Sequence, residues 1–349
     1  MSKKRFSLII STSLALILAL AMIVGAGCAP TAPAPPVKEA IKLIASTYIP
    51  PSYLDLVPPM EDYVKYVNEK GQGIVEIEFY SAGTLLKAKE AIPGLRKGSA
   101  DMIFHTSTYW SGDIPIYNGY SLPFLWKDCF DMQSKLSLGT PLRQLVDEEL
   151  RKQGYYIVAE GATPVEHLWV AKGVPPIRKP EDLKGLKMRS AGKPESKTLI
   201  TLGAAPIRMP SAEISEALAR GTIDGCMFYM GTVGGRVLYE PLTSVTRATF
   251  GGYTVPLIMM EYKWEGLPDD VRAILTEAAK IYEAEFSKRA FKVHQEQYWI
   301  EWEKAGNEII VLSPAEEAAF REALKPVFDW FTEEECPDAG KKFMELATK

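Results

Sequence analysis

The sequence has few histidines and cysteines and lacks the short motifs of common enzymes. Its 349 residues include three histidines and four cysteines. There is no glycine-rich phosphate loop and no G-x-S-x-G, H-E-x-x-H or C-x-x-C motif. We therefore expect no metal ion, no cofactor and no catalytic residues, although the lack of a motif does not by itself exclude an enzyme.

A strong charge of one sign is also absent. The formal net charge is -4 and no basic block occurs, which argues against a nucleic-acid partner. Hydrophobic residues make up 47% of the chain and charged residues 24%, as is typical of globular proteins. The length suits about two domains of roughly 100–200 residues each.

The first 28 residues differ from the rest. Three basic residues precede the mostly apolar Phe6–Val24, and the small residues Gly25–Gly27 then precede Cys28. This order predicts a secretory signal peptide over residues 1–27. The small residues before Cys28 resemble a bacterial lipobox, in which the cysteine is lipidated. A plain signal peptide or a retained anchor is the alternative.

Residues 28–39, rich in proline and alanine, are expected to form an extended tether. No later segment has the roughly 20 apolar residues needed to span a bilayer. We expect the protein in the periplasm or on the outer face of the cell membrane, held by a lipid at Cys28. Three cysteines then remain, an odd number, so we expect free and mostly buried thiols, with a single disulfide as the alternative; they are Cys129, Cys226 and Cys336.

The first half of the chain alternates strands and helices. Strands are predicted at Ile41–Ser46, Val75–Phe79 and Asp101–Phe104, with helices over Pro58–Asn68 and Lys87–Lys97 between them. This β-α-β-α-β order is typical of an open, mainly parallel sheet. In such sheets ligands bind beyond the carboxyl ends of the strands.

A second α/β unit is predicted over Leu183–Gly225. Its short strands are Leu186–Met188 and Ala204–Ile207, and Arg189 stands at the carboxyl end of the first. An arginine suits this place because its guanidinium can donate two parallel hydrogen bonds to a carboxylate.

Several segments are expected to connect the two units. His167–Ala171 reads as a strand that crosses to a second lobe, and a long helix runs from Leu267-Pro268 to about Lys304. The sequence thus predicts a two-lobed α/β fold like that of periplasmic binding proteins, with hinge strands and a long helix extending over both lobes. The predicted boundaries are 40–165 and 252–290 for lobe I, and 166–251 and 291–349 for lobe II.

Several motifs, in order, resemble the solute receptors of TRAP transporters, the DctP family. They are YSAGTLLKAKEAIPGLRKGSADM, LPFLW, PEDLKGLKMR, LGAAPIRMPSAEISEALARGTIDG and LPDDVRAIL. The resemblance covers most of the chain after the tether. It implies a receptor that binds an organic acid anion outside the cell and delivers it to the small and large membrane permease subunits. It also implies that Arg189 clamps the ligand carboxylate.

Two positions depart from the family pattern. Many members carry a second arginine where Trp169 stands, and many read D-G-Q-E-N-P where this chain has Asp224–Tyr229, which puts Phe228 near the asparagine. The resemblance therefore implies a less polar pocket. We expect a monocarboxylate with an apolar or aromatic body, although both side chains could instead belong to the core.

Further ligand contacts are expected just beyond strand ends and at a helix start. The candidates are Tyr48, His105, Thr106, Trp110, Ser211 and Tyr229. Three alternatives remain open: an ABC-type binding protein, a sensory receptor, and a lipid-anchored envelope hydrolase.

Overall fold

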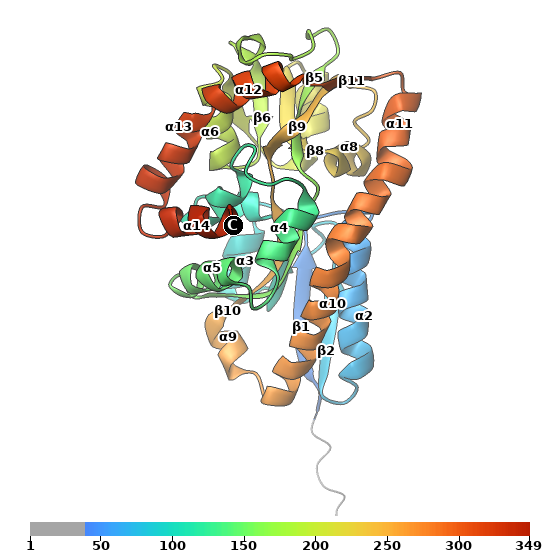
Figure 1. Ribbon diagram of the computed structural model, residues 1–349. Helices are drawn as coiled ribbons and strands as arrows, with labels where there is room; N and C mark the ends of the chain where they lie inside the picture. Colours follow the sequence, from blue (N-terminus) through green and yellow to red (C-terminus); the bar gives the residue numbers. More distant parts are fainter. Residues whose placement is uncertain (1–38) are drawn as a thin grey trace, which may run out of the picture. The chain divides into compact units, whose positions relative to one another are not determined.

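The computed structural model describes residues 39–349. Residues 40–349 form one compact unit that contains two β-sheets (Figure 1). The predicted signal peptide, Cys28 and nearly all of the tether lie outside the described residues.

The first sheet has five strands in the order β2-β1-β3-β10-β4. Strand β1 pairs in parallel with β2 and β3, whereas β10 runs antiparallel to β3 and β4. The predicted β-α-β-α-β start is confirmed. The strands are β1 (Ile41–Thr47), β2 (Val75–Tyr80), β3 (Met102–Phe104), β4 (Tyr155–Ala162) and β10 (Thr254–Met260).

The second sheet has six strands in the order β11-β9-β5-β8-β6-β7. Strand β6 pairs in parallel with β7 and β8, and β5 lies antiparallel between β8 and β9. The predicted α/β unit around Arg189 is therefore present. The strands are β5 (Glu166–Ala171), β6 (Lys187–Ser190), β7 (Ala205–Arg208), β8 (Gly225–Tyr229), β9 (Leu242–Gly251) and β11 (Glu308–Val311).

Helices flank both sheets (Figure 1). One predicted helix starts late: Lys87–Glu90 form a turn in which the Glu90 carboxylate accepts the Lys87 N–H, and helix α3 begins at Ala91. The helices are α2 (Val57–Lys70), α3 (Ala91–Lys97), α4 (Cys129–Leu136), α5 (Pro141–Arg151), α6 (Lys193–Thr201), α7 (Ile214–Ala219), α8 (Met230–Arg236), α9 (Glu261–Gly266), α10 (Asp269–Val293), α11 (Trp299–Lys304), α12 (Pro314–Ala323), α13 (Lys325–Asp329) and α14 (Gly340–Ala347).

Several chain crossings join the lobes that the two sheets define. The chain passes from β4 to β5, returns from β9 to β10, and crosses again along α10 and α11, which a π-helical turn at His294–Tyr298 connects. The two strand crossings touch, since Thr163 N donates to Tyr253 O over 3.0 Å. The predicted long helix over both lobes is confirmed (Figure 1), with the π-helical turn as its interruption.

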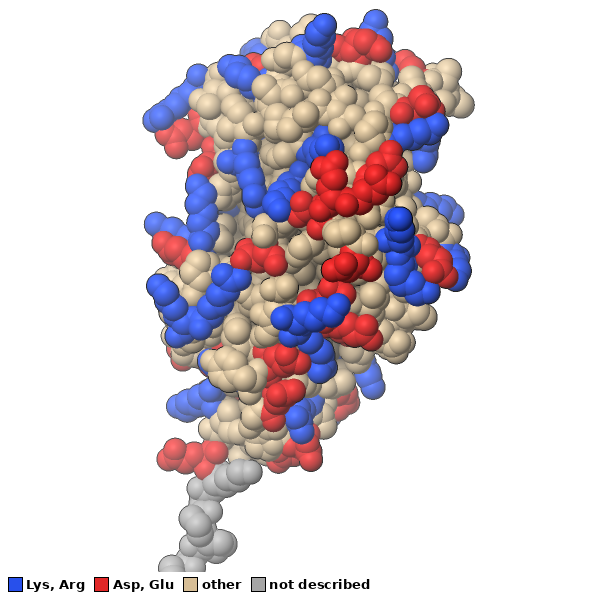
Figure 2. Space-filling view, turned by 90° about the vertical axis from the view of Figure 1, so that its left-hand side faces the viewer, with Lys and Arg blue, Asp and Glu red and all other residues tan. Residues whose placement is uncertain are grey.

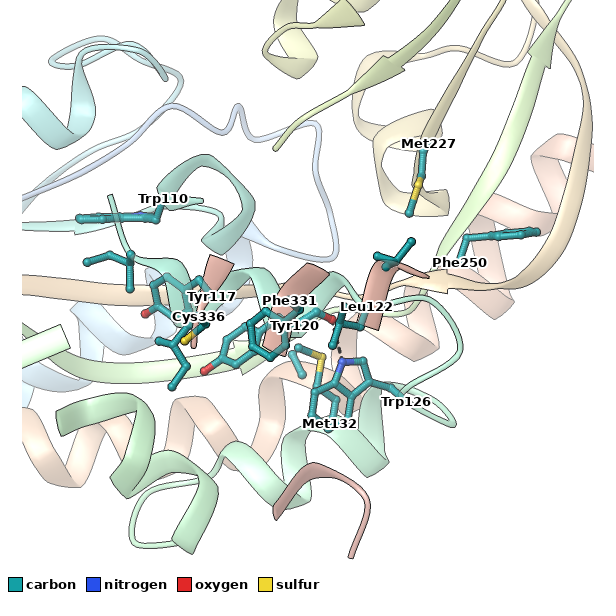
Figure 3. Packing of buried hydrophobic residues seen from close by; sticks show 14 of the residues in the cluster. Trp110, Tyr117, Tyr120, Leu122, Trp126, Met132, Met227, Phe250, Phe331 and Cys336 are labelled. Carbon is teal, nitrogen blue, oxygen red and sulfur yellow. Dashed lines mark hydrogen bonds between the residues drawn. The ribbon is translucent and has the colours of Figure 1, made fainter. Parts of the chain in front are cut away.

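The last helix returns to the first lobe. Helix α14 packs against α4 and α5, which flank the first sheet, although the predicted boundaries place it in lobe II. The core beneath it is continuous with that of the second sheet, because Trp110 and Tyr120 share one cluster with Met227 and Phe250 (Figure 3). The lobes are thus joined by packed side chains as well as by crossing strands.

Candidate functional site

A cavity lies beyond the carboxyl ends of parallel strands from both sheets. Its walls follow β1 and β3 on one side and β6, β7 and β8 on the other, which is where a ligand is expected in open α/β sheets. The lining residues are Tyr48, Tyr53, Leu56, Thr106, Thr108, Tyr109, Glu166, Arg189, Ala191, Ser211, Phe228, Thr232 and Tyr253. The cavity measures about 20 Å³, room for about one water molecule. A larger ligand can therefore enter only when the lobes move apart.

Arg189 lies at the centre of this site. Strand β6 places it in a wall of the cavity, and only 3% of it is exposed. Its Nε donates to Met209 O over 3.1 Å, Nη1 to Met227 O over 3.4 Å, and Nη2 to the Tyr109 hydroxyl over 3.3 Å. Within the described residues, none of these partners is a carboxylate, so the positive charge is held by neutral oxygens.

Tyr109 brings the two lobes together at this arginine. Its hydroxyl oxygen also accepts the Ser211 N–H over 2.9 Å. Ser111, two residues further on in lobe I, accepts the Lys193 N–H and an Arg208 Nη2–H, each over 3.1 Å. The lobes are therefore closed on each other in this arrangement.

Phe228 lines the cavity, but Trp169 lies behind it. The two rings stack with centroids 5.5 Å apart, and Trp169 Nε1 donates to Phe228 O over 2.8 Å. Trp169 also stacks on Trp299 within the core of the second lobe. This follows from the strand register: Trp169 faces Cys226 rather than a cavity residue across the β5–β8 pair.

Three other predicted contacts also lie behind the walls. His105 is buried under the Tyr48 and Tyr109 rings and its Nε2 lies 3.1 Å from Ala88 O, while burial lowers its pKa to about 4. Trp110 belongs to the core cluster of Figure 3. Tyr229 is buried against Tyr253 and His294. None of the three lines the cavity, whereas Tyr48, Thr106 and Ser211 do.

The cavity also contains an acidic side chain, Glu166, which is fully buried with Glu195 beside it. Burial raises the pKa of Glu166 well above its usual value, the Glu195 carboxyl raises it further, and Arg189 opposes both. Glu195 in turn accepts the N–H groups of Ala191 and Gly192 at the start of α6. Burial raises the pKa of Glu195 as well, so both carboxyl groups hold a proton more tightly than they would in water.

Sequence reasoning missed Tyr109 and Glu166. Tyr109 lies three residues after Thr106 in the same loop, so the loop signal that selected Thr106 could have included it. Glu166 is an acidic first residue of an otherwise mostly apolar strand, which is a usable signal. Tyr53 and Tyr253 carry no such signal, because they reach the cavity through the tertiary fold.

A wider pocket of about 470 Å³ adjoins the cavity and shares Tyr109 and Ala191 with it. Arg208 lines this pocket and donates from Nε to Ala191 O over 3.0 Å.

Figure 2 shows basic and acidic side chains interspersed over one face of the molecule, so neither positive nor negative charge dominates this face.

Cys129, Cys226 and Cys336 are free and buried, as predicted. Among residues 39–349, no three side chains of the metal-binding types gather into a possible site. None of the helices in this range combines the length and apolar character that a membrane crossing requires.

Two lobes that close over a buried arginine at the ends of parallel strands define a solute-binding protein. The chain belongs to the family described as bacterial extracellular solute-binding protein, family 7, or DctP, which matches residues 58–335. This confirms the predicted family.

Relatives and solved structures agree. The chain is 26% identical to a solute-binding protein of Albidiferax ferrireducens, over 73% of this chain and 74% of that one. It is 27% identical to the C4-dicarboxylate-binding periplasmic protein DctP of Rhodobacter capsulatus, over 77% and 79%. The fold matches a Bordetella pertussis extracytoplasmic solute receptor that binds pyroglutamic acid, with a TM-score of 0.80, 20% identity, and coverage of 89% of this chain and 100% of that one.

Proposed function

We propose that this protein captures an organic acid anion between its lobes and delivers it to the small and large permease subunits of a TRAP transporter. The observation that carries the proposal is Arg189, a buried cation whose hydrogen-bond partners in the described residues are all uncharged. A buried charge is costly unless an opposite charge accompanies it. The Glu166 and Glu195 carboxyl groups lie nearby but accept no hydrogen bond from the guanidinium, so a ligand carboxylate would supply the opposite charge in direct contact with it.

The carboxylate would bind where Arg189 now meets Tyr109. Arg189 Nη2 and the Ser211 N–H both donate to the Tyr109 hydroxyl oxygen, so both donors already converge on one acceptor. A carboxylate oxygen can take that place, and the Tyr109 O–H can then donate to it. In support, similar structures were solved with L-malate, β-D-glucuronate and succinate, which all carry a carboxylate.

The rest of the ligand would meet aromatic walls. The rings of Phe228, Tyr53, Tyr253 and Tyr48 line the cavity, beside the hydroxyl groups of the tyrosines and of neighbouring threonine and serine residues. The ring faces can pack on an apolar or aromatic ligand body. We therefore propose a monocarboxylate with an apolar or aromatic body, touched by Tyr48, Thr106, Ser211 and Phe228. Trp169, His105, Trp110 and Tyr229 are assigned to supporting these walls. A thermal-shift panel of carboxylates tests this, and stabilisation by uronic or sialic acids alone would contradict it.

The experiment that tests the site is identification of the ligand released from the purified protein, by mass spectrometry. Its affinity is then measured for the wild type, Arg189→Ala and the control Arg178→Ala, whose side chain pairs with Glu308 at the surface. We expect Arg189→Ala to cost roughly 2–5 kcal/mol of binding free energy and the control to cost nothing. Equal affinity in all three would refute the clamp.

We propose a receptor and not an enzyme. The bound acid should be released chemically unchanged after prolonged incubation with the protein. Turnover that stops on substitution of His105 or His167 would instead favour the hydrolase alternative.

We also propose a lipid at Cys28, on the strength of the lipobox-like residues before it. The intact mass of protein extracted from membranes would show the added acyl chains, and Cys28→Ala should release the protein in soluble form. A mature chain that starts elsewhere and lacks acyl mass would exclude the anchor.

A further inference from the structure

Glu166 is the only acidic residue among those that line the cavity. It is the first residue of β5 and lies opposite Gly251 of β9 in the strand register. A Cβ at Gly251 would stand 2.5 Å from Glu166 Oε2, so a glycine at this place leaves room for the carboxyl group. The fold thus holds an acid in a wall that also contains Arg189.

The Glu166 carboxyl has an unused acceptor. Its Oε2 is buried without a hydrogen-bond partner in the described residues, and the Arg189 guanidinium donates to other atoms. A buried polar atom without a partner is uncommon in native proteins and calls for an explanation. A ligand that donates a hydrogen bond would provide one.

The Glu166 and Glu195 carboxyl groups also affect which charge the ligand can carry. Burial raises the pKa of both groups, and the Glu195 carboxyl raises that of Glu166 further, so negative charge is unfavourable at this place. A second ligand carboxylate there would be disfavoured for the same reason, whereas a hydrogen-bond donor would meet the unpartnered Glu166 Oε2.

We propose that Glu166 makes the site selective for acids that combine a single carboxylate with a hydrogen-bond donor, and that it disfavours dicarboxylates. The donor can be an ammonium, an amide N–H or a hydroxyl group. The inference rests on the proposed function, because it requires that Arg189 holds a carboxylate in this cavity.

The test compares acids that differ in one group. Calorimetry measures the affinities of propanoate, lactate, alanine and succinate, and of the first three with a phenyl ring on the third carbon. The wild type should bind at least one donor-bearing acid about tenfold more tightly than its donor-free analogue, because the donor would satisfy a buried acceptor that otherwise lacks a partner. Succinate should bind more weakly than propanoate.

Two substitutions of Glu166 test whether this residue causes the selectivity. Glu166→Leu removes the acceptor and should bring the donor-bearing to donor-free ratio close to one. Glu166→Gln keeps the shape and an acceptor oxygen, so it should keep the preference for lactate and separates loss of the acceptor from a change of shape. The control Glu160→Gln alters another buried acid, outside the cavity, and should leave every ratio unchanged.

The outcomes separate the two proposals. A wild type that binds donor-free acids or succinate as tightly as the donor-bearing ones overturns the role of Glu166 and leaves the carboxylate site standing. Selectivity that survives both Glu166 substitutions does the same. If no acid binds, or if Arg189→Ala weakens none of them, the proposed function fails and this inference fails with it.

Discussion

Two buried arginines of this chain differ in what surrounds their charge. Arg143 of α5 donates to the carboxylates of Asp147 and Glu283, each over 2.8 Å, and to Leu136 O and Ile157 O. Arg189 of β6 donates to carbonyl oxygens and a phenol. The first has its counter-charges within the fold, so it serves to join α5, α10 and β4.

This difference indicates the role of Arg189. The fold provides carboxylates that accept hydrogen bonds from the buried Arg143, and it could have done the same for Arg189. Around Arg189 the nearby acids accept none of its N–H groups: Glu195 accepts the N–H groups of Ala191 and Gly192, and Glu166 Oε2 has no hydrogen-bond partner in the described residues. We propose that Arg189 has no hydrogen-bonded carboxylate within the fold because a ligand anion binds it.

Removing the paired arginine should have the largest effect on stability. Arg143→Met leaves the buried Glu160 and Glu283 and the half-buried Asp147 without their cation, and we expect a loss of about 3–5 kcal/mol in the free energy of unfolding. Arg189→Met should cost much less in the absence of ligand, because it abandons no paired carboxylate. Denaturant unfolding of both variants measures these losses. Equal losses would show that the two arginines contribute equally to stability, contrary to the account.

The pH dependence of stability should sharpen the comparison at Glu160. This carboxyl lies 3.9 Å from Arg143 Nη1, and burial raises its pKa from 4.5 to about 7 although Arg143 opposes the change. Because the folded state holds the proton more tightly than the unfolded state, the stability contributed at pH 5 is lost as the pH rises to 7. Raising the pKa from 4.5 to about 7 corresponds to at most about 3 kcal/mol in the free energy of unfolding.

The measurement for this prediction is the free energy of unfolding of the wild type and Glu160→Gln at pH 5, 6 and 7. The wild type should lose stability relative to the variant across this range. Parallel curves would show that Glu160 keeps its ordinary pKa.

The smallest expected effect concerns Tyr109, the hydroxyl that both lobes share at Arg189. Tyr109→Phe removes one hydrogen bond, so it should weaken carboxylate binding by about 1 kcal/mol, roughly fivefold. The matched control is Tyr66→Phe, since Tyr66 bonds to Glu277 far from the cavity. Tighter binding by Tyr109→Phe would mean that the hydroxyl competes with the ligand.

Much of the fold could be predicted because it depends on local patterns. The alternation of apolar and polar residues in Val75–Phe79 predicted β2, and the spacing of Met60, Tyr63 and Val67 on one face predicted α2. The return of α14 to the first lobe could not be predicted, because it depends on packing against α4 and α5, far away in sequence.

The site was predictable only in part, for a related reason. Arg189, Thr106 and Ser211 stand at or just after strand ends, and strand direction brings such positions together. Trp169 and Phe228 lie on the same face of the β5–β8 pair, and Trp169 pairs with Cys226, two residues before Phe228. A resemblance alone cannot tell which of the two rings reaches the cavity. The position of Glu166 in the cavity could not be predicted, because it depends on the register of β5 against β9.

The central claim is that Arg189 binds the carboxylate of the transported acid. A crystal structure of the protein with its co-purified ligand tests it most directly. We predict a ligand carboxylate oxygen about 2.7–2.9 Å from the Arg189 guanidinium and a second contact from the Ser211 N–H. A ligand bound elsewhere, with Arg189 still donating only to Met209, Met227 and Tyr109, would contradict the account.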